Sequence, residues 1–366
     1  MTHPETDVLV ALSGGMDSAA AVLFLREAGY RPRALFLDML DDERARAQTR
    51  QTAQQVGVEL TVEPCAERFQ AEVVRHVLRE HAAGRTPSPC THCNPHIKWR
   101  LLVEAADRLG IRHIATGHYV QKETYKGHAC FRRGIDPAKD QSYYLWEVPE
   151  AWIKRALLPL GGFTKEEVRR RLREQYGLEP LAAQRESMGI CFTAGMRYEA
   201  FLRQALPPET MTPGEVTDTR GRVIGTHEGY PFYTAGQKRG FTLQPTVAQQ
   251  GGTWAVQRVE ARENRIVVCR PEELYSRTLW LSAWRAVSPA ALFDHPEHLS
   301  VVVRGLGRNP QGGCILDVEE SGLLRVTLTD DRAWAVMPGQ PVVFYRGDCV
   351  VGGGILEHAD YSDNGR

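Results

Sequence analysis

A segment near the start of the sequence, residues 7–28, constrains the fold more than any other. Residues 7–12 read DVLVAL, an apolar, valine-rich run that predicts a buried parallel strand. SGGMDS follows at residues 13–18, and residues 18–28 have the composition and periodicity of a helix. A glycine turn between a strand and a helix exposes backbone N–H groups at the positive end of the helix, where an anion such as phosphate can bind.

The same alternation continues for about a hundred residues. Further strands are expected at residues 31–39, 58–64 and 112–119, and helices at residues 43–56, 67–81 and 98–109. Strands that alternate with helices predict an α/β fold with a doubly wound parallel sheet, whose ligands bind beyond the carboxyl ends of the strands.

The pattern changes at about residue 207 to short β-branched runs separated by glycine-rich turns. Such runs predict antiparallel hairpins and a small barrel. We therefore expect an α/β domain at residues 1–199, a central β-rich domain at 200–273 and a C-terminal β-barrel at 274–366.

The composition excludes several classes of protein. Of the 366 residues, 42% are hydrophobic and 25% charged, and no apolar run approaches the roughly 20 residues that span a bilayer. A net charge of zero argues against a general polyanion binder, although a local basic face is compatible with it. The eight cysteines are spread too widely for a disulfide framework and are expected to be reduced. With no visible secretory signal, a cytoplasmic protein is expected.

The glycine turn identifies the expected cofactor. A Walker loop would place a lysine after the glycines, and none follows them here. SGGMDS instead resembles the signature of the PP-loop, or N-type ATP pyrophosphatase, superfamily, which cleaves ATP between the α and β phosphates and adenylates an oxygen of the substrate. The resemblance implies that ATP and Mg²⁺ are bound, with Asp17 holding the metal against the phosphates.

Three cysteines stand apart from the other five. Cys90 and Cys93 lie in TPSPCTHCNPHIKW, and Cys191 lies in RESMGICF. A C-x-x-C pair alone leaves open whether it holds a metal, stores redox equivalents or attacks a substrate. The isolated cysteines are expected to be small buried hydrophobic residues.

Six segments extend the resemblance to nearly the whole chain. GRTPSPCTHCNPHIKW, ATGHY, KDQSYYL, SMGICF, GTHEGYPFYTAGQKRGF and PGQPVVFYRGDCVVGGGIL occur in the order found in bacterial tRNA-uridine 2-sulfurtransferases, the 2-thiouridylases of the MnmA type. The resemblance implies ATP-dependent adenylation of the C2 oxygen of wobble uridine 34, followed by sulfur transfer that gives 2-thiouridine, AMP and pyrophosphate. It also implies tRNA as a partner, and the tRNAs for Lys, Glu and Gln are the expected substrates. A second implied partner is a persulfide donor such as a cysteine desulfurase or relay protein. Binding to DNA or to a membrane is not expected.

The resemblance also assigns site residues. It places Cys93 at the catalytic nucleophile and Cys191 at the cysteine that carries the persulfide. The positions that match ATP-binding residues are Ala11, Leu12, Ser13, Gly14, Gly15, Met16, Asp17, Ser18, Leu37 and Gly117. The positions that match the segment facing the target base or the tRNA are Ser88, Pro89, Cys90, His118, Lys139, Asp140, Gln141, Arg304 and Gln340. The C-terminal barrel is expected to bind tRNA.

Cys90 departs from the pattern, because better-known members of the family carry an aspartate there. Cys90, Cys93 and Cys191 form a set that related RNA thiolases use to ligate a [4Fe–4S] cluster, with sulfide as donor. The two-cysteine relay and the cluster therefore remain open, as does a zinc site completed by His92 or His96.

Two further hypotheses concern the function as a whole. The chain could be an amidotransferase-like PP-loop ligase, or an RNA-binding protein without catalytic activity. Two basic segments are also relevant: Lys238 and Arg239 in GQKRGF are candidate phosphate contacts, and the run at residues 163–177 is either a solvated helix face or an RNA contact.

Overall fold

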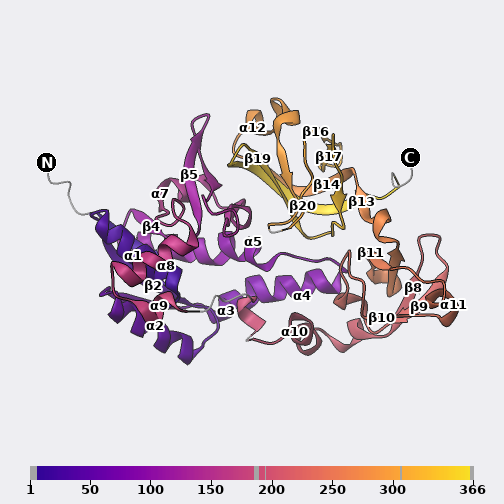
Figure 1. Cartoon of the computed structure of the whole chain (residues 1–366), viewed down its shortest axis with the longest axis horizontal. Coiled ribbons are helices and arrows are strands. Elements are labelled where there is room, and N and C mark those ends of the chain that lie inside the picture. The colour runs from indigo at the N-terminus through magenta and orange to yellow at the C-terminus, as the bar shows by residue number, and fades with distance from the viewer. Residues whose placement is uncertain (1–5, 185–188, 194, 306, 363–366) are drawn as a thin grey trace. The chain divides into compact units, whose positions relative to one another are not determined.

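The computed structural model describes residues 6–184, 189–193, 195–305 and 307–362 (Figure 1). Contacts within the chain divide it into two compact units. Unit 1 takes the described residues within 1–73, 90–188 and 348–351, and unit 2 takes those within 74–89, 189–347 and 352–366. Ser187 and Met188 of the SMGICF segment lie outside the described residues.

Unit 1 is built on a parallel five-stranded sheet with the strand order β3-β2-β1-β4-β7. Its strands are β1 (Asp7–Ala11), β2 (Arg31–Asp38), β3 (Leu60–Pro64), β4 (His113–Ala115) and β7 (Ala156–Leu157). The chain winds one way from β1 to β3 and then crosses back to β4, so the carboxyl end of β1 lies where the strand order reverses. Ligands of open parallel sheets bind at this point.

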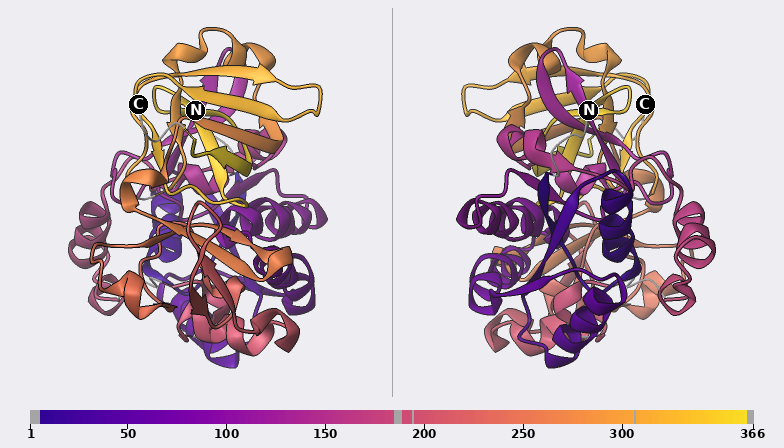
Figure 2. Two further views of the ribbon diagram at one scale, coloured as in Figure 1. Left: turned by 90° about the vertical axis from the view of Figure 1, so that its right-hand side faces the viewer. Right: turned by 90° about the vertical axis from the view of Figure 1, so that its left-hand side faces the viewer.

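Helices cover both sides of this sheet (Figure 2). The longer ones are α1 (Met16–Glu27), α2 (Glu43–Gln55), α6 (Trp99–Arg108) and α8 (Lys165–Glu174). The shorter ones are α3 (Ala66–Phe69), α5 (Pro89–Cys93), α7 (Glu150–Arg155) and α9 (Glu179–Ala182). Small and aliphatic residues of α1 are buried against β1, α8 and α9, and they form the core next to the glycine turn. The predicted doubly wound parallel sheet is therefore confirmed.

Two expected elements of unit 1 differ in detail. The helix expected at residues 67–81 is interrupted by a π-helical turn, η1 (Gln70–Val74), before α4 (Arg75–Ala82), which lies in unit 2. A second π-helical turn, η2 (Asn94–Lys98), joins α5 to α6 and contains Pro95. Proline has no backbone N–H to donate to the preceding turn, which disfavours a regular α-helix here.

The strand expected at residues 112–119 ends at Ala115, and an unpredicted hairpin follows it. The hairpin consists of β5 (Val120–Tyr125) and β6 (His128–Arg133). Lys126 and Gly127 both take positive φ in its two-residue turn, at 47° and 86°. Residue Cys349 pairs with Arg132 of β6, which brings residues 348–351 into unit 1.

The central part of unit 2 is a five-stranded sheet with the order β10-β9-β8-β12-β11. Its strands are β8 (Gly214–Thr217), β9 (Val223–His227), β10 (Phe241–Leu243), β11 (Ala255–Glu260) and β12 (Arg265–Cys269). The predicted hairpins β8–β9 and β11–β12 are antiparallel. The sheet also contains a parallel pair, β8 with β12, which hairpin signals cannot reveal because the two strands are distant in sequence.

The C-terminal part of unit 2 is also β-rich. Its main sheet has the order β15-β19-β20-β14-β17-β16. The strands are β13 (Tyr275–Ser276), β14 (Thr278–Ala286), β15 (Ser300–Val302), β16 (Cys314–Val318), β17 (Leu324–Leu328), β18 (Ala333–Trp334), β19 (Pro341–Arg346) and β20 (Cys349–Asp360). Short helices of unit 2 are α10 (Tyr198–Ala205), α11 (Pro245–Ala248) and α12 (Pro289–Phe293).

Residues 74–89 are anchored within unit 2 by a half-buried arginine. Arg85 donates to Glu80 at 2.7 Å and to Glu357 at 2.6 Å, and Thr86 donates its backbone N–H to the Pro338 carbonyl at 2.8 Å. Within the described residues, the helices are too short or too polar to cross a bilayer.

Candidate active site

The glycine loop between β1 and α1 is held by hydrogen bonds within the loop and from α2. The Ser13 N–H donates to the Ser18 hydroxyl at 3.1 Å, and the Ser18 hydroxyl donates to the Gly15 carbonyl at 3.0 Å. Gly14 takes a φ of 77°, and its carbonyl accepts a hydrogen bond from Thr52 at 3.1 Å. A Cβ at Gly14 would lie 2.8 Å from the Thr49 hydroxyl. Glycine is therefore required here by both conformation and space.

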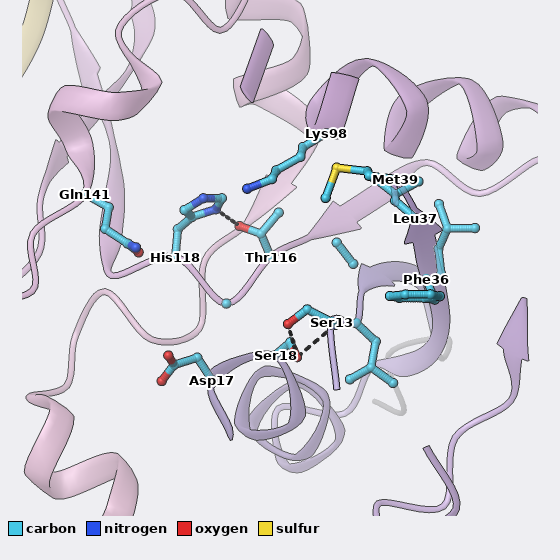
Figure 3. Close-up of a pocket in the computed structure, with 14 residues that line it drawn as sticks. Ser13, Asp17, Ser18, Phe36, Leu37, Met39, Lys98, Thr116, His118 and Gln141 are labelled. Carbon is cyan, nitrogen blue, oxygen red and sulfur yellow. Dashed lines mark hydrogen bonds between the residues drawn. The ribbon is translucent and has the colours of Figure 1, made fainter. Parts of the chain in front are cut away.

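A cavity of about 260 Å³ opens beside this loop at the carboxyl edge of the sheet (Figure 3). Its lining combines residues that follow three strands: Ala11, Leu12, Ser13, Asp17 and Ser18 after β1; Leu35, Phe36, Leu37 and Met39 of β2 and its end; and Thr116, Gly117 and His118 after β4, together with Lys98 and Gln141. Apolar side chains of β2 form one wall, with the hydroxyls and Asp17 opposite. Such a cavity suits a flat apolar ring with polar groups at its edges.

Gly117 approaches the helix that follows the glycine loop. A Cβ at this position would lie 2.8 Å from the backbone carbonyl carbon of Asp17 and 2.9 Å from the Ser18 nitrogen. Both obstacles are backbone atoms, so a larger residue would displace the loop itself. The structure thus brings Gly117 to the glycine loop, although 100 positions separate it from Asp17 in the numbering.

A second cavity, of about 280 Å³, shares Ser13, Asp17 and Gln141 with the first. Gly15, Met16, Tyr119, Lys139, Lys165, Arg169 and Gln184 complete its lining. Three of these side chains are cationic, so the second cavity suits the phosphates of a nucleotide whose base occupies the first. Of the predicted ATP-binding residues, Gly14 lines neither cavity and shapes the turn instead.

Asp17 is the centre of a small polar cluster in the second cavity. Lys165 donates to both carboxylate oxygens of Asp17 at 2.7 Å, and the Tyr119 hydroxyl donates to one of them at 2.8 Å. The Lys165 ammonium also lies 5.3 Å from the centre of the Tyr119 ring. A carboxylate in this position fits Mg²⁺, which is commonly bound by one or two carboxylates together with substrate phosphates.

Sequence reasoning missed Lys165 and Tyr119. Lys165 is the first residue of α8, whose capping box joins Thr164 and Glu167. A lysine at the positive end of a helix is electrostatically unfavourable unless an anion is near. A lysine at the start of this predicted helix was therefore the sequence feature that could have indicated a nearby anion.

Lys139, Asp140 and Gln141, predicted as tRNA contacts, have different surroundings. Lys139 and Gln141 line the second cavity, and the Gln141 side-chain oxygen accepts the Tyr119 N–H at 2.9 Å. The Asp140 carboxylate instead accepts hydrogen bonds from its own loop, including the Ser142 hydroxyl at 2.8 Å. Asp140 therefore organises the loop that presents the other two side chains.

His118 and Lys98 face each other in the first cavity (Figure 3). Burial, together with the charge of the nearby Lys98 ammonium, lowers the pKa of His118 to about 3. His118 Nδ1 lies 2.8 Å from the Thr116 hydroxyl, and its ring stacks on Trp99. The imidazole is thus neutral at physiological pH and can act as a hydrogen-bonding group without charge.

The C-x-x-C pair lies on α5, with Cys93 buried and Cys90 exposed. Cys65 follows β3 at the same edge of the sheet as the first cavity. Burial, with smaller contributions from the charges of Asp38, Glu63 and an ionised Cys93, raises the pKa of Cys65 to about 12. Cys93 is thus within range of an electrostatic interaction with Cys65, and Lys98, at the end of the turn that follows Cys93, lines the first cavity at this edge.

Other groups around the pair are hydrogen-bonded to backbone. The Asn94 side-chain nitrogen donates to the Tyr144 carbonyl at 2.9 Å, and the His96 Nδ1 lies 2.9 Å from the His92 carbonyl. The His92 Nε2 lies 3.1 Å from the Glu72 carbonyl. Cys90 lies near Tyr144, whose pKa is raised by burial and by the charge of an ionised Cys90.

The remaining predicted residues belong to unit 2. Cys191 is exposed and begins a short 3₁₀ turn, Cys191–Thr193. Arg304 donates to the Ala335 carbonyl at 2.6 Å and lies over the Trp334 ring, while Gln340 is half-buried. Ser88 and Pro89 are half-buried, at the start of α5. Contact of these residues with tRNA remains a prediction.

Comparisons with known proteins cover nearly the whole chain. A family model described as the tRNA methyl transferase HUP domain matches residues 6–195, a tRNA methyl transferase PRC-barrel domain matches 199–270, and an aminomethyltransferase beta-barrel domain matches 276–356.

Curated relatives carry a common name. The tRNA-specific 2-thiouridylase MnmA 2 of Phocaeicola vulgatus is 34% identical over 97% of this chain and 99% of its own length. The MnmA protein of Chlorobium chlorochromatii is 36% identical over 96% of this chain and 98% of its own length. The MnmA protein of Pseudomonas aeruginosa PAO1 is also 36% identical, over 98% of this chain and 96% of its own length. The chain, with its PP-loop between β1 and α1, belongs to the tRNA-specific 2-thiouridylase (MnmA) family.

Proposed function

We propose that this protein is a tRNA 2-thiouridylase that adenylates the C2 oxygen of wobble uridine 34 and replaces that oxygen with sulfur. One observation carries the proposal most directly. A nucleotide-sized cavity beside the glycine loop and the buried thiol of Cys93 lie at the same carboxyl edge of one parallel sheet. Adenylation and attack by sulfur both need groups at that edge.

The first step uses the two cavities together. Residues of the first cavity would hold the adenosine, and the loop N–H groups with Lys165 and Lys139 would bind the phosphates. The uridine O2 attacks the α-phosphate and pyrophosphate leaves. Mg²⁺ held by Asp17 would neutralise charge on the phosphates when bound. In this structure the Lys165 ammonium donates to both oxygens of the Asp17 carboxylate. Metal binding at Asp17 would therefore release the Lys165 ammonium to interact with the departing pyrophosphate.

The second step uses two cysteines. The thiolate of Cys93 attacks the inner sulfur of a persulfide on Cys191, so that a Cys93–Cys191 disulfide forms and hydrosulfide leaves. Hydrosulfide adds at C2 of the adenylated uridine, and AMP departs with the original oxygen. A thiol reductant then restores both cysteines. The exposure of Cys191 suits it to accept sulfur from a donor protein, such as a cysteine desulfurase or a relay protein.

The cluster mechanism predicts a different purified protein. In that mechanism Cys90, Cys93 and Cys191 would each supply a thiolate to a [4Fe–4S] cluster, whose open iron supplies a binding position for sulfide. Cys90 is exposed and lies on the same short helix as Cys93, which suits either a ligand or an additional thiol. Anaerobic iron and acid-labile sulfide analysis separates the two mechanisms.

The decisive experiment combines full-length protein with a tRNA transcript, ATP, Mg²⁺ and a persulfide donor. We expect 2-thiouridine in the digested tRNA, together with tRNA-dependent release of pyrophosphate. Cys93→Ser and Cys191→Ser should abolish thiolation but keep pyrophosphate release, whereas Cys314→Ala, which removes a buried thiol of the C-terminal sheet, should keep both. Thiolation that survives both serine variants would exclude the cysteine relay. Incorporation of ammonia in place of sulfur, unchanged in both variants, would favour the amidotransferase-like alternative.

The cysteine mechanism has its own control. About four irons per chain, lost in Cys90→Ala together with sulfide-dependent thiolation, would replace the persulfide mechanism with the cluster mechanism. An iron-free protein in which Cys90→Ala remains active supports the two-cysteine relay.

A further inference from the structure

The central sheet of unit 2 borders a cavity of about 540 Å³ that contains none of the proposed catalytic residues, and whose lining includes Lys238 and Arg239, the candidate phosphate contacts of the GQKRGF segment. It is lined by Lys238, Arg239, Phe241, Leu243, Gly252 and Trp254, among others. We propose that this cavity binds one unpaired nucleotide of an RNA chain, with the base against Phe241 and Trp254 and a neighbouring phosphate at Lys238 and Arg239. The identification of that RNA as tRNA rests on the proposed function.

The loop on one side of the cavity is fixed by Arg270. Its guanidinium lies 4.2 Å from the centre of the Trp254 ring and donates to the carbonyls of Gly251 and Thr253 at 3.2 and 3.3 Å. Gly252 takes a φ of 79°, and a Cβ there would lie 2.5 Å from the arginine. Trp254 is therefore held in place before any ligand binds, which lowers the entropic cost of binding.

The loop on the other side is fixed as well. The Tyr233 hydroxyl donates to the Gly240 carbonyl, and the Gln237 side chain donates to the Arg239 carbonyl at 2.9 Å. Gly240 takes a φ of 97°, which closes the turn. The backbone of this turn is thus held while the side chains of Lys238 and Arg239 are exposed.

The charge at the cavity is uncompensated. Arg258 and Arg265, in the same sheet, both pair with Glu260. In the described part of the chain, Lys238 and Arg239 have no such ion pair, and no carboxylate lines the cavity. The two neighbouring cations can bind an anionic group, and the apolar cavity beside them can hold a flat ring attached to that group.

Trp254 adds a stacking surface. Its indole N–H is buried and lies out of reach of a ligand in the cavity, but an aromatic ring offers a stacking surface for any base. An acidic peptide would satisfy the cations but would leave the two aromatic rings without a planar partner. The combination therefore favours RNA.

The test measures binding of a fluorescent tRNA transcript to the full-length protein by anisotropy over a range of salt concentrations. The variants are Lys238→Gln with Arg239→Gln, and Trp254→Leu. The matched control is Arg220→Gln with Arg262→Gln, which removes two exposed arginines near the same sheet. ATP affinity, measured by calorimetry, should be the same in all of them.

We expect the Lys238/Arg239 double variant to weaken tRNA binding about tenfold and to reduce the slope of log Kd against log salt by about two. Trp254→Leu should weaken binding about tenfold without changing the slope. A double variant that binds tRNA as the control does would overturn the proposal. Loss of poly-L-glutamate binding with retained tRNA binding would assign the cavity to an acidic protein instead.

The outcomes also separate this proposal from the proposed function. A wild-type protein that fails to thiolate tRNA but loses RNA affinity in the double variant keeps the nucleotide site and loses the thiouridylase assignment. A wild-type protein that thiolates tRNA, with variants that bind normally, keeps the enzyme and loses the site.

Discussion

The ammonium of Lys165 lies 2.7 Å from both carboxylate oxygens of Asp17, although 148 positions separate the two residues in sequence. The lysine side chain is only 11% exposed, whereas the Asp17 side chain is 36% exposed, so the carboxylate remains accessible from the cavity. This contact puts a cation at the carboxylate that is expected to hold Mg²⁺. We therefore expect Mg²⁺ to replace the Lys165 ammonium at the Asp17 carboxylate when ATP binds.

Removing that cation should slow the first chemical step. Lys165→Met is expected to lower tRNA-dependent pyrophosphate release about 100-fold, because a charge that stabilises the departing phosphates is lost. Arg170→Met is the control, since Arg170 lies on the same helix and is exposed. Equal rates for the two variants would show that Lys165 only balances the charge of Asp17.

Gly117→Ala should abolish ATP binding, because the added Cβ meets backbone atoms of Asp17 and Ser18 that cannot rotate away. Gly162→Ala is the control, since a Cβ there has nothing within 4 Å and the residue has no positive φ. Calorimetric titration with ATP measures the difference. Normal affinity in Gly117→Ala would mean that the loop moves freely, contrary to its hydrogen bonding.

Burial of His81 should make stability depend on pH. Its ring nitrogens lie 2.9 Å from the Tyr198 hydroxyl and 3.1 Å from the Pro231 carbonyl, and burial lowers its pKa to about 4. Because the unfolded chain takes up a proton below about pH 6.5 and the folded chain does not, this contribution is present above pH 6.5 and is lost as the pH falls towards 4.

The loss attributable to His81 is on the order of 3 kcal/mol in unfolding free energy. His81→Gln should be less stable at pH 7 and should show a shallower decline between pH 6.5 and 4. Urea unfolding at several pH values measures both. A variant with the wild-type slope would assign the decline to other groups.

Exposure should determine which cysteines react. Cys90 and Cys191 are exposed and should be alkylated by iodoacetamide in the folded protein at neutral pH. Burial raises the pKa values of Cys65, Cys130, Cys269 and Cys314 to about 12 in each case, so these thiols should remain unmodified. Peptide mass spectrometry locates the label, and labelling in denaturant shows that each peptide can be detected. Modification of Cys314 before Cys191 would contradict the exposures described here.

Local sequence patterns predicted the parts of the fold that depend on neighbouring residues. The strand, glycine turn and helix at residues 7–28 lie where their pattern indicated, and so do the hairpins of the central sheet. The β5–β6 hairpin was missed, because the Lys126–Gly127 turn is a weaker signal than Asn-Gly or Asp-Gly. The parallel pairing of β8 with β12 depends on tertiary packing and has no local signal.

The candidate site shows the same division. The glycine loop, Leu37 and Gly117 were expected together, and they line or support one cavity. Lys165 and Tyr119 could not be assigned to Asp17. The Lys165 contact follows from how α8 packs against α1, and the Tyr119 contact from the pairing of β4 with β1. Cys65 was expected to be buried, and it is, but its proximity to Cys93 required the order of the strands.

Cys349 pairs with Arg132 of β6 and the Asp348 carbonyl accepts the Arg133 N–H, so residues 348–351 belong to unit 1, although most of unit 1 precedes residue 189. A truncated gene that stops after the α/β region would leave the β6 edge without this pairing, and the hydrophobic residues Val350 and Val351 would be missing from it. Such a fragment is expected to aggregate when expressed alone. The nucleotide-binding half is thus expected to need residues 348–351 for its fold, and studies of that half are best made on the full chain.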